Sequence, residues 1–236
     1  MSTFLQLVNL ARSEAGVASG DLSTLQGALS QESARFKTWI KNEWVRVQAA
    51  HPDWQFLRTS GEFTTTAGQA SYTPQQAKAT VDGTSTGASI MADWKRDSFR
   101  LSTSGASYTD EAILGFMPWD IYRNMYQYGP MRAARSKPVA FTVDPQKNLW
   151  LGQAPDGAYV VPYEFYRTPQ VLDADADVPL CPDRFHDLIA YRALRAYGIF
   201  MSAPEVIGRA DNVIDKVYPD LCNDQLPPMM TGNPLA

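Results

Sequence analysis

KPVAFTVDPQKNLWLGQAPDGAYVVPYEFYRTP, residues 137–169, carries the clearest β signal in this chain. Two clusters of turn-forming residues, DPQKN and APDG, separate three apolar runs at 139–143, 149–151 and 159–166. Turns of this kind between short runs of β-branched and aromatic residues predict a three-stranded antiparallel meander. Pro162 lies inside the third run and has no N–H to donate, so it indicates an edge strand or a bulge.

Short apolar runs bounded by glycine continue on the N-terminal side of this segment. Further strands are predicted at 54–74, 98–102 and 111–117. Between them, residues 75–93 are mostly small and polar, which is typical of a long loop. WDIYRNMYQYG follows Pro118, and its apolar spacing predicts a short helix. The whole middle of the chain is therefore expected to be rich in β-structure.

Helical signals precede this β-rich region. Thr3 followed by Gln6 matches a capping box, so a helix is predicted to begin there and to end near Gly16. A second helix is predicted over 31–50, because the residue before Pro52 is disfavoured in helical geometry. Its buried stripe is predicted to contain Phe36, Ile40, Glu43, Trp44 and Val47.

Helical spacing returns after the acidic linker VLDADADVPL. Helices are predicted over 183–201 and from about Pro204 onward, the second with a kink or a restart at Pro219. The terminal LPPMMTGNPLA is too rich in proline to continue a helix and is expected to form an exposed tail.

The order of helices, sheet and helices predicts an α+β fold, in which the two terminal segments form a helical bundle and the middle forms an antiparallel meander. We expect a single module over 1–224, followed by an extended C-terminal arm at 225–236. Within the module, helices occupy about 3–50 and 183–224, and the β-rich part occupies 54–170.

Composition excludes several classes of function. A net charge of −4 and a pI near 5.2 argue against a dedicated nucleic-acid binder, which needs a basic surface. Cys181 and Cys222 are the only cysteines, so a disulfide framework is excluded and a reducing compartment is favoured. The N-terminus does not resemble a signal peptide, and the chain contains no 18-residue apolar run. We therefore expect a chain made and used in the cytosol, without membrane contact.

Charge is unevenly distributed along the chain. Residues 121–143 contain no acidic residue but include Arg123, Arg132, Arg135 and Lys137. Five aspartates crowd into 173–187, at positions 173, 175, 177, 183 and 187. Opposed patches of this kind suit head-to-tail contact between identical subunits, and two solvated faces are the alternative.

The motifs that catalysis would need are weak or incomplete. GTSTG at 83–87 matches the GxSxG elbow of serine hydrolases and would make Ser85 the nucleophile with His186 as base, but the motif lacks the required strand before it and helix after it. The DxDxD run beginning at Asp173 lacks the glycine and glutamate of a calcium loop. Two histidines and two distant cysteines supply no zinc set. We predict no catalytic residue, no metal and no cofactor.

The helix predicted over 183–201 is apolar over much of its circumference. One arc contains Phe185, Ile189, Ala193, Ala196 and Phe200, and a second contains Ala190, Leu194 and Tyr197. This width predicts packing on two sides, as in a bundle that also meets a neighbouring subunit. Arg192 falls in the apolar sector and needs a partner, either Glu43 of the same chain or a residue of a neighbour. His186 is predicted at the flank of the arc, so its replacement by alanine should be tolerated better than that of Arg192.

Several segments, taken in order, resemble the head-to-tail adaptor proteins (head completion or connector proteins) of tailed bacteriophages. They are FLQLVNLARSEAGV, ARFKTWIKNEWVRVQAAHPDWQFLR, PDGAYVVPYEFYRTPQVL, DVPLCPDRFHDLIAYRALRAYG and the final helix that runs into LCNDQLP. The resemblance implies a structural virion protein rather than an enzyme, located at the neck of the virion after assembly in the host cytoplasm.

The resemblance also implies an oligomer and partners. The subunit would form a ring, commonly dodecameric, that joins the portal protein to tail or neck proteins and extends the DNA channel without sequence-specific DNA binding. The arm at 225–236 would reach the portal, with anchors at Leu226, Met229, Met230 and Leu235. Contacts between subunits are predicted at Arg132, Arg135, Arg192 and Tyr197.

Two other functions are kept as alternatives. One is the serine hydrolase with Ser85 and His186. The other is a β-rich carbohydrate-binding module of a virion, motivated by four aromatic residues near the predicted meander, Trp150, Tyr159, Tyr163 and Tyr166.

Overall fold

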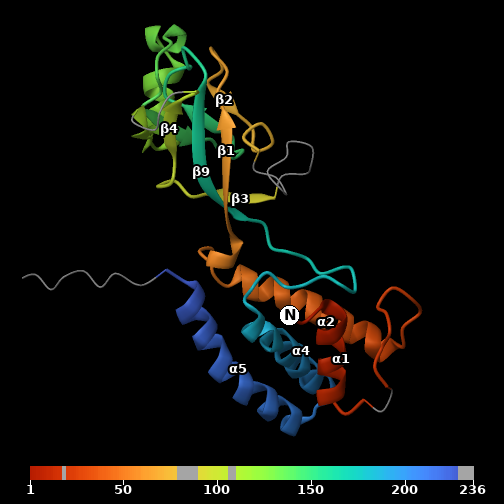
Figure 1. Ribbon diagram of the computed structural model, residues 1–236. Helices are drawn as coiled ribbons and strands as arrows, with labels where there is room; N and C mark the ends of the chain where they lie inside the picture. The colour runs from red at the N-terminus through yellow and green to blue at the C-terminus, as the bar shows by residue number, and fades with distance from the viewer. Residues whose placement is uncertain (18–19, 79–89, 106–109, 228–236) are drawn as a thin grey trace, which may run out of the picture. The chain divides into compact units, whose positions relative to one another are not determined.

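The computed structural model describes residues 1–17, 20–78, 90–105 and 110–227 (Figure 1). The chain divides into two compact units. The helical unit combines residues 1–57 with 169–236, and the sheet unit is formed by Arg58–Thr168. Helices and mainly antiparallel sheets confirm the predicted α+β class.

Within its described residues, the helical unit contains four long helices. They are α1 (Phe4–Glu14), α2 (Gln31–Ala49), α4 (His186–Met201) and α5 (Pro204–Gln225), with short 3-10 turns η1 (Gln55–Leu57) and η6 (Asp183–Phe185). α4 packs against α1, α2 and α5, so it is the central helix of this unit. α5 runs without interruption through Pro219, so the predicted restart there is wrong.

Both ends of α1 follow the capping chemistry predicted from the sequence. The Gln6 amide donates to Thr3 Oγ1 at 3.3 Å, and the Thr3 amide donates to Gln6 Oε1 at 2.9 Å. At the other end, Gly16 has a positive φ of 73°, and the Val17 amide donates back to the Arg12 carbonyl at 3.1 Å. This left-handed residue closes the last turn, because glycine adopts the conformation without steric cost.

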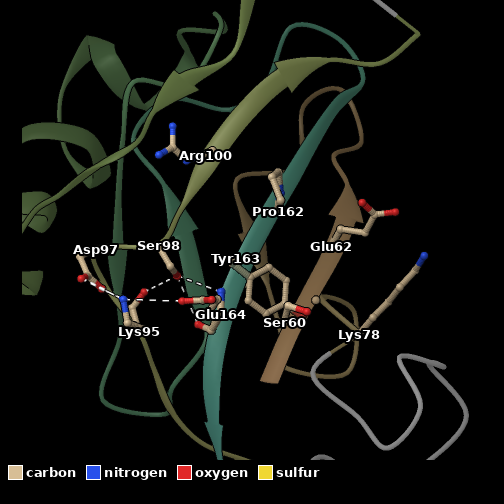
Figure 2. Close-up of a pocket in the computed structure, with 11 residues that line it drawn as sticks. Ser60, Glu62, Lys78, Lys95, Asp97, Ser98, Arg100, Pro162, Tyr163 and Glu164 are labelled. Atoms are coloured by element: carbon tan, nitrogen blue, oxygen red, sulfur yellow. Dashed lines mark hydrogen bonds and ion pairs between the residues drawn. The ribbon is translucent and has the colours of Figure 1, made fainter. Parts of the chain in front are cut away.

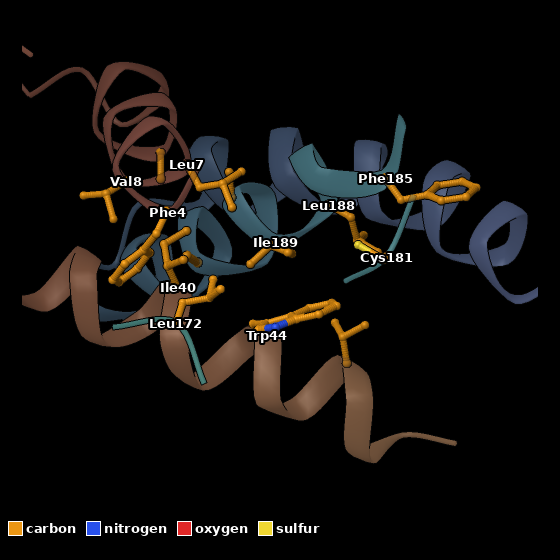
Figure 3. Close-up of a cluster of buried hydrophobic side chains, with 14 of the residues drawn as sticks. Phe4, Leu7, Val8, Ile40, Trp44, Leu172, Cys181, Phe185, Leu188 and Ile189 are labelled. Carbon is orange, nitrogen blue, oxygen red and sulfur yellow. The ribbon is translucent and has the colours of Figure 1, made fainter. Parts of the chain in front are cut away.

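The main core of the helical unit lies between α1, α2 and α4 (Figure 3). Phe4 and Leu7 of α1 meet Ile40 and Trp44 of α2 and Ile189 of α4, all of them buried. A second cluster on another side of α4 joins three residues, Leu194, Val206 and Ala210. The two-sided packing predicted for α4 is therefore present, but α5 of the same chain covers the second side.

The sheet unit contains two sheets among its described residues. The first has the order β1 (Arg58–Thr64), β9 (Tyr159–Arg167), β4 (Arg100–Thr103), β5 (Ala112–Ile113), with β3 (Met91–Trp94) also paired to β9. The second has the order β2 (Ser71–Tyr72), β8 (Leu149–Leu151), β7 (Ala140–Val143), β6 (Gly115–Phe116). Three short helical segments follow β6, namely α3 (Trp119–Tyr122), the π-helix η4 (Arg123–Gln127) and the 3-10 helix η5 (Pro130–Ala133).

The predicted three-stranded meander is wrong in its third strand. β7 and β8 form the expected antiparallel hairpin, but β9 belongs to the other sheet and pairs with β1 along its length. The connection at 152–158 is longer than a tight turn, so it does not force β9 beside β8. β1 instead offers an antiparallel partner from Arg58 opposite Tyr166 to Thr64 opposite Val160. β6 and β7 pair in parallel.

Pro162 lies in a central strand, not at an edge. β1 pairs with one side of β9, while on the other side β4 pairs with residues 159–160 and β3 with residues 165–167. Pro162 falls in the interval between β4 and β3, where the ladder on that side is interrupted. The missing N–H of proline can be accommodated in this interval. Pro162 therefore requires neither the edge strand nor the bulge that was predicted.

Aromatic side chains fill the core of the sheet unit. Phe99 packs against Phe141 at 4.2 Å between ring centroids and stacks on Tyr163 at 5.4 Å. Alternate residues of β9, from Tyr159 to Phe165, face this core.

Candidate functional site

His186, at the start of α4, is completely buried rather than at the flank of the helix. The Ser2 amide donates to its Nδ1 at 3.1 Å, and its Nε2 lies 3.0 Å from the Cys181 carbonyl oxygen. Because an amide can only donate, Nδ1 must accept and Nε2 must carry the proton that is donated to Cys181. Asp183 Oδ1 is farther away, at 3.7 Å.

These contacts oppose the hydrolase hypothesis. Both ring nitrogens of His186 are bound to the backbone, so neither is available to take a proton from a nucleophile. Ser85 lies outside the described residues. Burial raises the pKa of the Cys181 thiol to about 12, which keeps this sulfur protonated and unreactive.

Arg192 pairs with Glu43 inside the chain, one of the two alternatives predicted from the sequence. Its Nε lies 3.0 Å from Glu43 Oε2, and Glu43 also accepts from Arg46. The Glu43 side chain is only 8% exposed, and the guanidinium of Arg192 lies 5.9 Å from the ring centroid of Tyr218. The pair joins α2 to α4, so Arg192 has a role within the fold, and its predicted role between subunits stays a prediction.

The C-terminal end of α4 exposes three large apolar side chains. Ile199, Phe200 and Met201 are 56%, 52% and 53% exposed, and we call them the α4 apolar patch. The predicted burial of Phe200 is therefore wrong. Its ring lies 5.9 Å from Trp39 of α2, and the guanidinium of Arg35 lies 4.3 Å above it.

Tyr197 borders this patch. Its ring stacks on Phe36 at 5.0 Å, and its hydroxyl donates to Glu32 Oε1 at 3.2 Å. The predicted subunit-contact residue is therefore half-buried and oriented by its own chain, next to side chains that are exposed.

The aspartates of the acidic linker hold the helical unit together. Asp175 accepts from the Thr24 hydroxyl at 2.5 Å and from the Leu25 amide at 2.9 Å. Asp173 pairs with Lys41. Asp177 accepts from the backbone amides of residues 173 and 174. No cluster of metal-binding side chains is found within the part of the chain that the structure describes.

Asp175 gives the helical unit a predicted pH dependence. The hydrogen bond from Thr24 holds the pKa of this carboxyl below its ordinary value of 3.8. A carboxyl with a lowered pKa in the folded state stabilises the fold above its unfolded pKa, and this stabilisation disappears as the pH falls through the folded pKa. Asp175→Asn is therefore expected to flatten the loss of thermal stability on acidification, whereas Asp53→Asn, at an exposed position of the same unit, should not. Melting curves of both variants at a series of acidic pH values test this, and parallel curves for Asp175→Asn and wild type would refute it.

The basic residues of 121–143 differ in their surroundings. Lys137 Nζ donates to the Asp110 carbonyl at 3.0 Å, and Arg123 donates to the Tyr128 hydroxyl at 3.1 Å. Arg135 lies over Gly68, where a Cβ would come within 3.1 Å of its Cζ. Arg132 is exposed on η5. The guanidinium groups of Arg123, Arg132 and Arg135 thus lie at the surface of this segment.

The carbohydrate-binding hypothesis loses two of its four aromatic residues to burial. Tyr159 and Tyr163 are only 8% and 2% exposed, and burial raises the pKa of Tyr163. Trp150 is half-buried and donates from Nε1 to Asp144 Oδ2 at 3.0 Å, and Tyr166 is half-buried as well. Sugar stacking requires an open aromatic face, which the buried tyrosines cannot provide.

A cavity of about 730 Å³ in the sheet unit lies beside Pro162 (Figure 2). Lys95 pairs with Asp97 at 2.8 Å and with Glu164 at 3.6 Å, and the Glu164 amide donates to Ser98 Oγ at 2.8 Å. These charged groups satisfy one another, which is typical of a polar network that bridges the gap between β3 and β4.

Comparison with known proteins places the chain in a family. The model of the SU10 adaptor protein family matches residues 2–214, most of the chain. The chain belongs to the SU10 adaptor protein family. A search of the curated proteins found no match. The predicted resemblance to phage head-to-tail adaptors is confirmed at the level of the family.

Membership in this family makes the protein a structural adaptor of a bacteriophage. Portal and tail proteins are the partners of the family, and the virion neck is where the family is located. Because the family is a structural one, membership also argues against an enzymatic function of this chain. No described helix of the adaptor is long and apolar enough to cross a membrane.

The predicted portal anchors of the adaptor are only partly placed. Leu226 packs against the helical core, and its amide donates to the Cys222 carbonyl at 3.0 Å. Met229, Met230 and Leu235 lie outside the described residues.

Proposed function

We propose that the adaptor forms a ring, expected to be dodecameric, that docks beneath the portal, extends the DNA channel and receives the tail. The proposal rests on the α4 apolar patch together with the family. Aromatic, methionine and arginine side chains are enriched where proteins meet. Here the exposed Phe200 lies beside Trp39 and Arg35, and Met201 is exposed next to it in the chain.

Leaving the α4 apolar patch permanently exposed to water is energetically unfavourable. Fully burying a side chain such as Phe, Ile or Met stabilises by roughly 1.5–3 kcal/mol each relative to exposure. Three such side chains, each more than half exposed in one chain, gain from a second copy that covers them. The net charge of −4 also suits a channel wall, since a basic wall would retain the passing DNA.

The arm at 225–236 is proposed to reach the portal, as predicted from the resemblance. Leu226 lies at the end of α5 and ties the base of the arm to the helical core. This arrangement would let the remaining anchors act at a distance from the ring body.

Phe200→Asp is expected to abolish ring formation while leaving the monomer folded. The side chain is 52% exposed, so little of the core depends on it, whereas a carboxylate there would be buried in a subunit contact. Light-scattering mass of the purified adaptor, alone and mixed with portal protein, measures the effect. Val171→Asp is the matched control, because Val171 is also 52% exposed and belongs to the same unit.

Two results would contradict the proposal. One is a wild-type adaptor that stays monomeric with and without portal. The other is a Phe200→Asp variant that still reaches the ring mass, which would leave the family assignment intact but remove the α4 apolar patch from the interface.

A further inference from the structure

The segment between β6 and β7 leaves most of its apolar side chains outside the core of the sheet unit. Ile121, Met125, Tyr128 and Met131 are between 40% and 57% exposed. Tyr122 is the one buried residue of α3, and neither η4 nor η5 contains a buried residue. The helical spacing predicted for this segment is correct, but its apolar stripe faces solvent.

Two of these side chains, Tyr128 and Met131, line a groove of about 370 Å³, which we call the tyrosine groove. Its lining includes Tyr122, Tyr126, Tyr128, Met131, Arg132 and Trp150. The aromatic floor is held in place: Tyr122 donates to the Leu151 carbonyl at 2.9 Å and stacks on Trp119 at 5.7 Å. Tyr126 lies so close to Gly152 that a Cβ there would come within 3.3 Å of its Cζ. A preformed floor of this kind favours binding, because little side-chain entropy is lost.

The surroundings of the groove are cationic in an acidic protein. Arg132 lines the groove, and Arg123 and Arg135 are exposed in the same segment, where Asp120 is the exposed carboxylate; the chain as a whole carries a net charge of −4. Guanidinium groups bind carboxylates through paired hydrogen bonds. The groove therefore combines apolar contact area with recognition of negative charge.

We propose that the tyrosine groove binds a peptide segment of another protein, in which an apolar anchor side chain is flanked by carboxylates. Met and Tyr at its rim contact apolar side chains well, and methionine is frequent at peptide-binding surfaces. A nucleic acid would use the arginines but would leave Met131 at the rim without an apolar partner. The location of this partner, on the tail side or in the neck of the virion, rests on the proposed function. Binding of the peptide segment itself does not require a ring.

A second copy of the adaptor is a less suitable occupant, because its acidic linker is already used. Asp173 is paired with Lys41, Asp175 binds Thr24 and Leu25, and Asp177 binds backbone amides. Releasing these carboxylates to meet the groove would break contacts within the helical unit.

Binding is tested with two fluorescein-labelled hexapeptides, EDLFDE and its basic counterpart KRLFRK, by anisotropy with the purified adaptor at low salt. EDLFDE is expected to bind more tightly than KRLFRK. Arg132→Glu replaces an attraction by a repulsion and is expected to weaken EDLFDE binding about tenfold. Met131→Asp should weaken it as well, because Met131 is a 40% exposed rim residue. Lys216→Glu, an exposed cation of α5, makes the same change in net charge and should leave binding unchanged.

Equal binding of the two peptides, or an unchanged affinity of Arg132→Glu, would overturn the proposal. So would a single-stranded oligonucleotide that displaces EDLFDE and binds more tightly, since the groove would then be a nucleic-acid site. A lower oligomer mass of Met131→Asp would assign the groove to a contact between copies. Phe200→Asp should retain peptide binding, so a failure of the ring is distinguishable from a failure of the groove.

Discussion

Replacing His186 by alanine is expected to lower the free energy of unfolding by about 2–4 kcal/mol. The side chain is completely buried and bridges the Ser2 amide and the Cys181 carbonyl. Alanine leaves a cavity and removes the partner of both groups, one at the start of the chain and one in the linker before α4. Urea unfolding of the variant and the wild type, followed by circular dichroism, measures the difference.

Asp183→Asn serves as the control for this prediction. Asp183 lies 3.7 Å from His186 and is about half exposed, so its contribution through an ion pair should be small. If Asp183→Asn cost as much stability as His186→Ala, the histidine would act through the carboxylate and not through the backbone. A tolerated His186→Ala, as expected from the sequence alone, would show that the buried bridge contributes little.

The same substitution at two helical glycines is expected to have opposite effects. In α4, a Cβ at Gly198 would lie 2.8 Å from Ile207 Cγ1 and 3.2 Å from the Ile207 amide nitrogen. Gly198→Ala should therefore separate α4 from α5 and lower the free energy of unfolding by about 1–3 kcal/mol. In α5, Gly208 has no heavy atom within 4 Å of its Cβ position, so Gly208→Ala should raise stability by about 0.5–1 kcal/mol.

Urea midpoints of the two variants check this pair. A stabilised Gly198→Ala would mean that Ile207 moves aside easily and that the crossing of α4 and α5 tolerates a wider spacing. Because α4 and α5 also enclose the cluster of Leu194, Val206 and Ala210, Gly198→Ala is expected to increase the exposure of this cluster to amide exchange.

Local features of the fold were predictable because their causes lie close together in the sequence. The α1 capping box requires only Thr3 and Gln6, and its end requires only Gly16. The β7–β8 hairpin requires the turn between Val143 and Leu149. The Glu43–Arg192 pair could also be predicted from the sequence. A charged side chain in an apolar sector requires a partner, and the buried stripe of α2 contains the carboxylate of Glu43.

Contacts between segments that are far apart in the sequence were harder to predict. In the sequence β9 looks like the third strand of a meander. In the structure it pairs with β1, about a hundred residues earlier, because β1 offers an antiparallel partner for the residues from Val160 to Tyr166. The burial of His186 depends on the chain terminus, which the sequence gives no reason to place there. The tyrosine groove was missed because a helical apolar stripe normally indicates a buried face.

α4 shows which properties follow from the sequence and which follow only from the tertiary structure. The sequence by itself determined a helix with two apolar sides, because periodicity depends only on the spacing of residues along one backbone. Only the tertiary structure decided that α5 covers the second side and that the helix ends with Ile199, Phe200 and Met201 exposed. Which side is covered depends on where other segments return in space: Leu194 is buried in the core, whereas Ile199, five residues later on the same helix, is exposed.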